Sequence, residues 1–122
     1  MGKVYDLEDR TLRFAQDTIA YVNRLPRTIT NLEIAHQLAK SGPSVGANYR
    51  EANDALGRKD FFMHLRISRK EAKESAYWFQ LSQPLPGQDT ERVRLVDEAT
   101  QLMKIFGSII SRSEHGTPKK LE

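Results

Sequence analysis

Four stretches of helical periodicity, separated by three short breaks, are the feature that most constrains the fold of this chain. In each stretch the apolar residues recur every three or four positions, which is the spacing of one face of an α-helix. No stretch of useful length alternates as a strand would. Four helices of similar length with short connections pack antiparallel in sequence order, so the pattern predicts an all-α, up-down-up-down antiparallel four-helix bundle.

The first predicted helix runs from about Asp6 to Arg24 and ends at Leu25-Pro26. Its apolar stripe comprises Leu7, Thr11, Phe14, Ala15, Thr18, Ile19, Val22 and Leu25. The second predicted helix begins at a capping box, in which Thr30 is the N-cap and Glu33 reaches back to its backbone N–H. Its stripe comprises Leu32, Ala35, Leu38, Ala39, Gly42, Val45, Gly46, Tyr49, Ala52 and Leu56.

The second helix contains a proline and two glycines in its interior. Pro43 removes a backbone donor and crowds the carbonyl one turn back, at about 3 kcal/mol in a helix interior. We therefore expect a kink at Pro43. Gly42 and Gly46 lack a Cβ, so we expect a neighbouring helix to approach unusually closely there.

The third predicted helix begins at Asp60 as N-cap, after Gly57 as the C-terminal cap of the second helix, and runs to about Ser82. Its stripe comprises Phe61, Leu65, Ser68, Ala72, Ser75, Ala76 and Phe79. The proline-rich segment 83–88 is a break. The fourth helix is predicted from about Thr90 to Ser113, with a stripe of Val93, Val96, Ala99, Leu102, Met103, Phe106, Ile109 and Ile110.

Length and composition indicate one domain over residues 1–122, with a tail that we expect to be flexible from about residue 114. Leu121-Glu122 at its end could be native or left by a cloning site. The 19 Lys and Arg residues against 16 Asp and Glu residues give a mild net charge of +3. The absence of cysteine excludes disulfides and thiolate chemistry. No apolar run is long enough to cross a membrane, so we expect a soluble, cytoplasmic protein.

The third helix carries more apolar surface than a solitary bundle needs. Met63, Ile67 and Trp78 form a second strip beside its core stripe, and Phe62 and Tyr77 lie among basic residues. We interpret the strip as an interface between copies of the chain. The alternative is that these aromatic side chains only flank the core or lie under lysine and arginine stems.

Basic residues gather on the same helix and can hold phosphates. They are Arg58, Lys59, Arg66, Arg69, Lys70 and Lys73, with Arg50 nearby at the end of the second helix. The alternative is a solvated face whose cations pair with Glu71, Glu74, Asp54 and Asp60. Lys70 and Glu74, for instance, have the four-residue spacing of a helical ion pair.

No residue set has the spacing of a known active site. Glu71-x-x-Glu74 has a glutamate where a dinuclear metal site needs histidine, and the region around Gly42 and Gly46 lacks the Gly-Lys-Ser/Thr ending of a phosphate-binding loop. His36 and His115 lack catalytic neighbours. We expect Asn48 and Glu51 to hydrogen bond between helices or to pair with Arg69 or Lys73. We therefore predict no metal, no cofactor, no small-molecule substrate and no enzymatic activity.

Two segments carry a resemblance to a known family. Ser44-Val-Gly-Ala-Asn-Tyr-Arg-Glu-Ala52 and Lys59-Asp-Phe-Phe-Met-His-Leu-Arg-Ile-Ser-Arg-Lys-Glu-Ala-Lys-Glu-Ser-Ala-Tyr-Trp-Phe79 resemble the bacterial four-helix bundle proteins encoded in 23S ribosomal RNA intervening sequences. The match covers nearly the whole chain. The family signature falls on Ser44, Gly46, Ala47, Asn48, Glu51, Lys70, Glu71, Glu74 and Trp78, and none of these positions has an established catalytic role.

The resemblance implies a small cytosolic bundle that assembles into a ring, a homopentamer, without known enzymatic activity. A distantly similar group, the accessory variability determinant of diversity-generating retroelements, is a basic pentamer that contacts RNA and a reverse transcriptase. The first hypothesis is therefore a ring-forming scaffold that binds RNA or an RNA-protein complex through the third helix. The alternative is a protein-interaction adaptor without a nucleic-acid ligand, and an enzyme is third.

Overall fold

The computed structural model describes residues 6–115, and these form four α-helices and one short 3-10 helix. The elements are α1 (Leu7–Asn23), α2 (Ile29–Asn53), α3 (Arg58–Leu81), η2 (Pro86–Gln88) and α4 (Asp89–His115). No strand occurs in the described range. The all-α prediction with four helices is confirmed. The residues after His115, including Leu121-Glu122 and most of the predicted tail, lie outside the described part.

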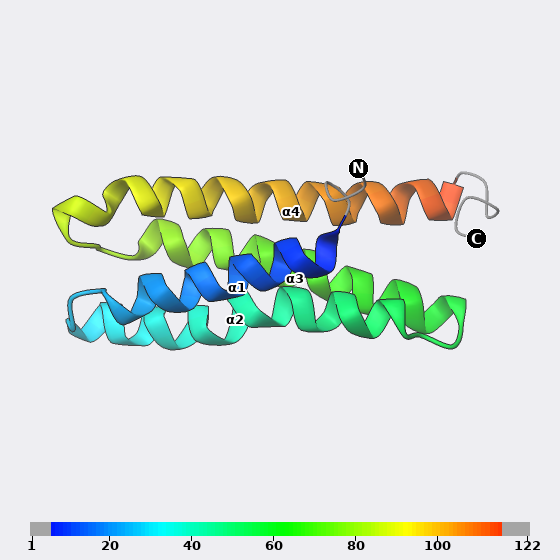
Figure 1. The fold of residues 1–122 in the computed structure, drawn as a ribbon, viewed down its shortest axis with the longest axis horizontal. Helices are drawn as coiled ribbons and strands as arrows, with labels where there is room; N and C mark the ends of the chain where they lie inside the picture. Colours follow the sequence, from blue (N-terminus) through cyan, green and yellow to red (C-terminus); the bar gives the residue numbers. More distant parts are fainter. Residues whose placement is uncertain (1–5, 116–122) are drawn as a thin grey trace.

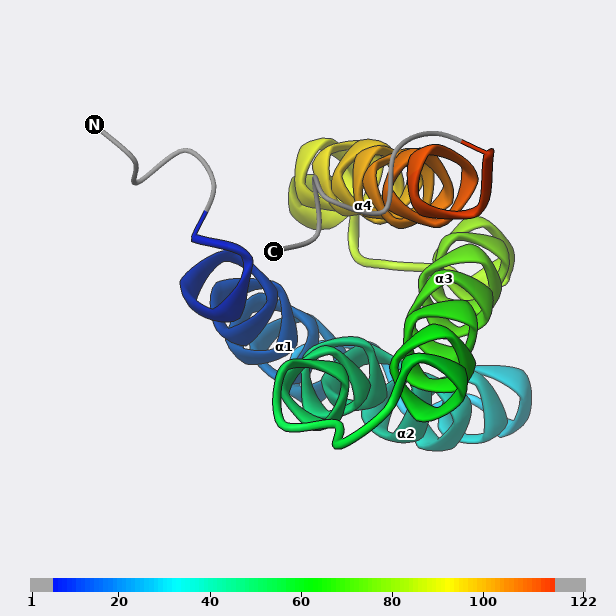
Figure 2. The same ribbon diagram turned by 90° about the vertical axis from the view of Figure 1, so that its right-hand side faces the viewer.

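The chain travels back and forth along the long axis of the molecule, so each helix lies beside the next one in sequence (Figure 1). α2 packs against α1 and α3, and α3 packs against α4. Of the neighbouring helix pairs, α1 and α4 make the fewest contacts. Figure 2 shows these two helices diverging toward the viewer, at the end where α1 begins and α4 finishes.

Large aromatic side chains fill the centre of the bundle. The Phe79 ring of α3 meets the rings of Phe14 and Tyr21 edge-on, with centroids 6.2 and 5.3 Å apart. The Tyr21 hydroxyl lies 2.7 Å from the Ser82 hydroxyl, so its polar end is satisfied inside the core. Because α1 and α3 both reach this cluster, it joins opposite sides of the bundle.

The close approach predicted at Gly42 and Gly46 is confirmed. A Cβ on Gly42 would lie 2.8 Å from Thr18 Cγ2, and one on Gly46 would lie 2.7 Å from Thr11 Oγ1. Both threonine hydroxyls donate to the carbonyl four residues earlier, so they leave no unpaired polar atom in the seam. α2 continues through Pro43 as one helix.

The start of α2 differs from the prediction, and the Thr30–Glu33 capping box is wrong. Thr28 is the N-cap, and its hydroxyl accepts the Asn31 backbone N–H at 3.1 Å. The earlier start turns Asn31 inward, where its amide nitrogen donates to the carbonyls of Pro26 and Gln83. Its Oδ1 accepts the Gln83 N–H at 3.0 Å. These bonds tie the first connection to the third.

The junction between α2 and α3 is also corrected. α2 ends at Asn53, and Gly57 is the N-cap of α3 instead of the C-cap of α2. Asp60 lies in the first turn of α3 and does not cap it. The earlier start of α3 brings Arg58 into the helix, and its guanidinium donates to the Ser113 carbonyl of α4 at 2.8 Å.

The predicted apolar stripes include several exposed residues and omit several buried ones. Ile19, Leu32, Leu56 and Val93 were placed in them but are exposed, as is Ala39. Tyr21, Ile34 and Leu95 are buried instead. On α4 the reason is geometric, because Val93 and Leu95 are two positions apart and cannot share a helix face. The stripe through Leu95 continues into the buried Ala99, Leu102 and Phe106.

Candidate nucleic-acid interface

The α3 basic face consists of the six cations predicted from the sequence. The structure divides them into three arginines that turn toward α4 and three exposed lysines. Five of the six are exposed, and Arg69 is half-buried. Lys59, Arg66 and Lys73 follow one another at seven-residue intervals, so they form a line along one side of α3, spaced by about 10 Å. Lys70 lies beside this line. The arrangement therefore places several positive charges on one solvent-facing strip.

The arginines of the α3 basic face turn toward α4. Arg58 donates to the Ser113 carbonyl, and Arg66 forms an ion pair with Glu114. Their guanidinium carbons lie 4.9 and 5.4 Å from the centre of the Phe62 ring, which is buried beneath them. For Phe62, the alternative in which an aromatic ring lies under arginine stems is therefore confirmed. These contacts orient two of the six cations.

Arg69 occupies the seam between α3 and α4. Its Cδ atom would lie 3.7 Å from a Cβ placed on Gly107 of α4. The pairing that was considered between Arg69 and Glu51 is not among the contacts of the described residues, and Glu51 is exposed.

The lysines of the α3 basic face are held more loosely. Lys70 Nζ lies 3.9 Å from Glu74, as the four-residue spacing predicted, and both side chains are largely exposed. Within residues 6–115, Lys59 and Lys73 form no ion pair. Exposed ion pairs are worth less than about 1 kcal/mol, so Lys70 can exchange its partner at little cost. All three lysines are therefore available to an anion.

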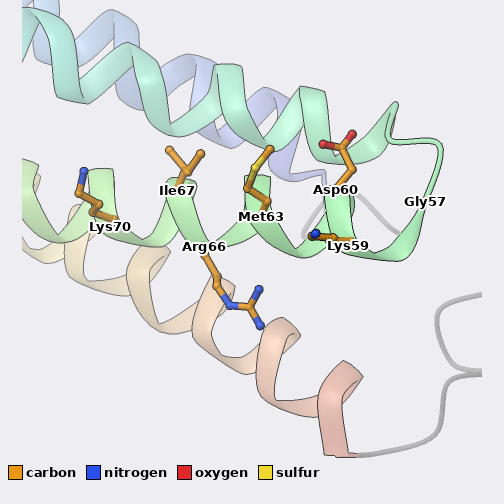
Figure 3. Close-up of a pocket in the computed structure, with 7 residues that line it drawn as sticks. All are labelled: Gly57, Lys59, Asp60, Met63, Arg66, Ile67 and Lys70. Carbon is orange, nitrogen blue, oxygen red and sulfur yellow. The ribbon is translucent and has the colours of Figure 1, made fainter.

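A groove of about 670 Å³ lies beside these cations (Figure 3). Met63 and Ile67 lie on it, together with Gly57, Lys59, Asp60, Arg66 and Lys70. Met63 is 46% exposed although its side chain is wholly apolar. In Figure 3 Met63 and Ile67 point to one side of α3 while Arg66 points to the other, toward α4.

Trp78, the third residue predicted at an interface between copies, lies outside this groove. It is half-buried, packs partly against the core, and stacks edge-on with the exposed Tyr77 at 5.3 Å.

Two of the family-signature residues, Ser44 and Asn48, belong to a hydrogen-bonded contact between α2 and α3. Asn48 Nδ2 donates to the carbonyl and the hydroxyl of Ser44, both at 3.0 Å. Asn48 Oδ1 lies 3.0 Å from His64 Nδ1, which is the hydrogen bond between helices that the sequence suggested for Asn48. His64 Nε2 also lies 3.5 Å from Asp60.

Two glutamates of the signature lie on α3. Burial, reinforced by the neighbouring Glu74 carboxylate, raises the pKa of Glu71, while Lys70 and Lys40 partly oppose the shift. Ala47, like Glu51, is exposed.

No group of three His, Asp or Glu side chains within residues 6–115 is placed to hold a metal ion. His36 is exposed on α2, and the side chain of His115 is outside the described part. Arg50, noted as a nearby cation, lies 3.7 Å from Glu8 of α1. None of the helices in the described range is long and apolar enough to span a bilayer.

The sequence reasoning missed a second groove, of about 630 Å³, between α1 and α4. Its residues are Leu7, Arg10, Tyr49, Lys104, Ile105, Ser108, Ile109 and Arg112. A signal was present in the predicted lengths, because the first helix was shorter than the fourth. A shorter helix leaves part of its neighbour uncovered.

The fold and its surface define a small all-α four-helix protein with a basic face on one helix. Its family follows from the family model for the 23S rRNA-intervening sequence protein, which matches residues 5–108. The chain belongs to this family. No curated protein matches it significantly.

A solved structure is similar over most of the chain. It is a protein of unknown function from the S23 ribosomal protein family of Bacteroides thetaiotaomicron, with 30% identity and a TM-score of 0.68. The match covers 85% of this chain and 94% of the other.

Proposed function

We propose that the protein is a non-enzymatic, cytoplasmic scaffold that assembles into a ring of identical copies, a pentamer, and binds RNA through the α3 basic face. The subunit in this proposal is an up-down-up-down antiparallel bundle with α2 bent at Pro43. The observation that carries the RNA-binding proposal is the strip of exposed cations on α3, in which Lys59 and Lys73 lack an ion pair within the described residues.

The argument from charge depends on where the cations lie more than on the net charge of the chain. A net charge of +3 gives a single copy only a weak preference for anions. The three exposed lysines on the outward side of α3 raise the local potential, and Tyr77 adds an exposed aromatic ring to the same helix. Cations interleaved with aromatic rings suit single-stranded or looped RNA, where bases stack and phosphates pair.

Self-association is supported by the exposed apolar atoms of Met63 beside Ile67. An interface between copies would remove this surface from water and repeat the cations around the assembly. A ring therefore strengthens the positive electrostatic potential, which is weak around a single copy. The family name refers to an intervening sequence of 23S rRNA, and the similar structure carries the name of a ribosomal protein family, which agrees with a role near RNA.

The test is RNA affinity as a function of salt, with single-stranded and hairpin RNA probes. We expect the logarithm of the affinity to fall linearly with the logarithm of salt concentration, with a slope of about −0.7 per phosphate neutralised on single-stranded RNA. The double variant K59E/K73E should lose most of the affinity. The matched control R13E/R27E makes the same change in net charge at exposed positions on other elements and should lose much less.

Affinity that ignores salt, or equal losses in the two double variants, would remove the RNA-binding proposal. Recovery of one protein partner without nucleic acid would favour the adaptor instead.

A further inference from the structure

The second groove, between α1 and α4, is a different surface from the α3 basic face. Its apolar part is formed by Leu7, Tyr49, Ile105 and Ile109, and the Tyr49 ring packs against Phe106 with centroids 5.7 Å apart. It shares no residue with the six cations of α3 or with the Met63 groove. Any role of this α1–α4 groove is therefore separable from the RNA-binding proposal.

The shape of the α1–α4 groove follows from unequal helix lengths. α1 has 17 residues and α4 has 27. The ten additional residues of α4 extend about 15 Å. Arg10 pairs with Glu98 and Asp17 with Arg94, so the start of α1 lies toward the later residues of α4. The groove is lined by residues from the start of α1 and from the later part of α4. The two helices diverge at this end of the bundle (Figure 2). A short helix placed there would complete the fourth side of the bundle.

The charge of the α1–α4 groove is positive. Arg10, Lys104 and Arg112 lie on it, and among residues 6–115 no acidic side chain lines it. Arg10 is already held by Glu98, through contacts of 2.7 and 2.9 Å. Lys104 and Arg112 pair with no acidic side chain in residues 6–115, and they are eight positions apart, about 12 Å along α4. The ligand should therefore carry negative charge at two points on either side of the Ser108 position.

We propose that the α1–α4 groove binds an acidic amphipathic helix supplied by a partner protein. Apolar residues spaced i, i+3 or i+4 and i+7 on that helix would cover Ile105 and Ile109, and its carboxylates would meet Lys104 and Arg112. A polyanion such as RNA would use the two cations but leave the isoleucines uncovered. The helix satisfies both features of the groove, the apolar floor and the basic rim.

The absence of cysteine makes a site-specific test direct. Ser108→Cys, at an exposed position on the groove, is labelled with an environment-sensitive dye in the full-length chain. The probe is a synthetic helical peptide with leucine at i, i+3, i+4 and i+7 and glutamate at the other positions. We expect a saturable dye response to this peptide and at least about tenfold weaker binding of the matched peptide with lysine in place of glutamate. Ser111→Cys, exposed on α4 but outside the groove, should not respond.

Two kinds of variant localise the interaction. K104E/R112E should weaken binding of the glutamate peptide by about tenfold or more, because two attractions become repulsions. Ser108→Trp fills the groove from an exposed position without disturbing the core, so it should block binding in a folded protein, and Ser111→Trp should not. Circular dichroism confirms that each variant retains its helices.

Several results would overturn the proposal. They are no response at Ser108→Cys, equal responses at both cysteine positions, or unchanged binding in K104E/R112E and Ser108→Trp. A dye response that rises with protein concentration alone would assign the α1–α4 groove to a second copy. Displacement of the peptide by single-stranded RNA in the K59E/K73E background would assign it to RNA. Loss of RNA binding at the α3 basic face leaves this proposal intact.

Discussion

Gly46→Ala tests the packing of α1 on α2, because the added methyl group has no room. Its Cβ would lie 2.7 Å from Thr11 Oγ1, 3.0 Å from Thr11 Cβ and 3.5 Å from the Thr11 backbone carbonyl carbon. Because Thr11 is fully buried and its hydroxyl is bonded to Leu7 O, the contact can be relieved only if the helices move apart. Overpacking of this kind costs about 1–3 kcal/mol.

The overpacking penalty acts against a gain in helix propensity. Alanine is favoured over glycine in a helix interior by about 1 kcal/mol, so we expect Gly46→Ala to destabilise the protein by about 1 kcal/mol net. Gly107→Ala is the matched control, because its Cβ would meet only Arg69 Cδ at an ordinary 3.7 Å. It should stabilise the protein by about 1 kcal/mol.

The assay is urea unfolding followed by circular dichroism at one fixed protein concentration. The two variants should differ by about 2 kcal/mol in the free energy of unfolding. Adding Thr11→Ala should recover part of the loss in Gly46→Ala, because it removes the atoms that clash. If Gly46→Ala is as stable as Gly107→Ala, the account of the seam is refuted.

Two further predictions concern stability. Asn31→Ala removes three hydrogen bonds that join the connections at Pro26 and Gln83, and it should lower the free energy of unfolding in urea by about 3 kcal/mol. The control Gln37→Ala should lower it by less than about 0.5 kcal/mol, and equal losses would contradict the bridging role of Asn31. Because the pKa of Glu71 is raised, its ionised form is disfavoured in the folded state. Glu71→Gln should therefore melt at a higher temperature than the parent at pH 7, with the difference disappearing as the pH falls through the carboxyl pKa values; a lower melting temperature at pH 7 would show that the carboxylate is stabilising.

The helices were predictable because their signals are local. Apolar periodicity placed all four within about three residues of their observed ends. The two glycines of α2 predicted the close approach of a neighbouring helix, which the structure identifies as α1. The start of α2 was not predictable in this way. Asn31 is turned inward by bonds to Gln83, which is 52 positions away, and a local capping pattern contains no information on that contact.

In the candidate site, too, the local features were predictable and the long-range contacts were not. Its six cations could be read from the sequence, and so could the spacing of Lys70 and Glu74. Which of these cations are available to an anion could not be read from the sequence, because Arg66 is paired with Glu114, which lies 48 positions away on α4. The shorter predicted first helix was a signal for the α1–α4 groove, but the position of the groove depends on how α1 and α4 align after packing, which the periodicity within each helix does not report.

The most direct test of the central claim is the mass of the purified assembly in solution, measured by light scattering before and after nuclease treatment. The claim is that the outer side of α3 joins copies of the chain and aligns their cations on RNA. We expect a mass of several times 14.0 kDa, with co-purifying nucleic acid that nuclease removes, and a shift toward single chains in Met63→Glu. A particle of 14.0 kDa without nucleic acid at high micromolar concentration would contradict the account.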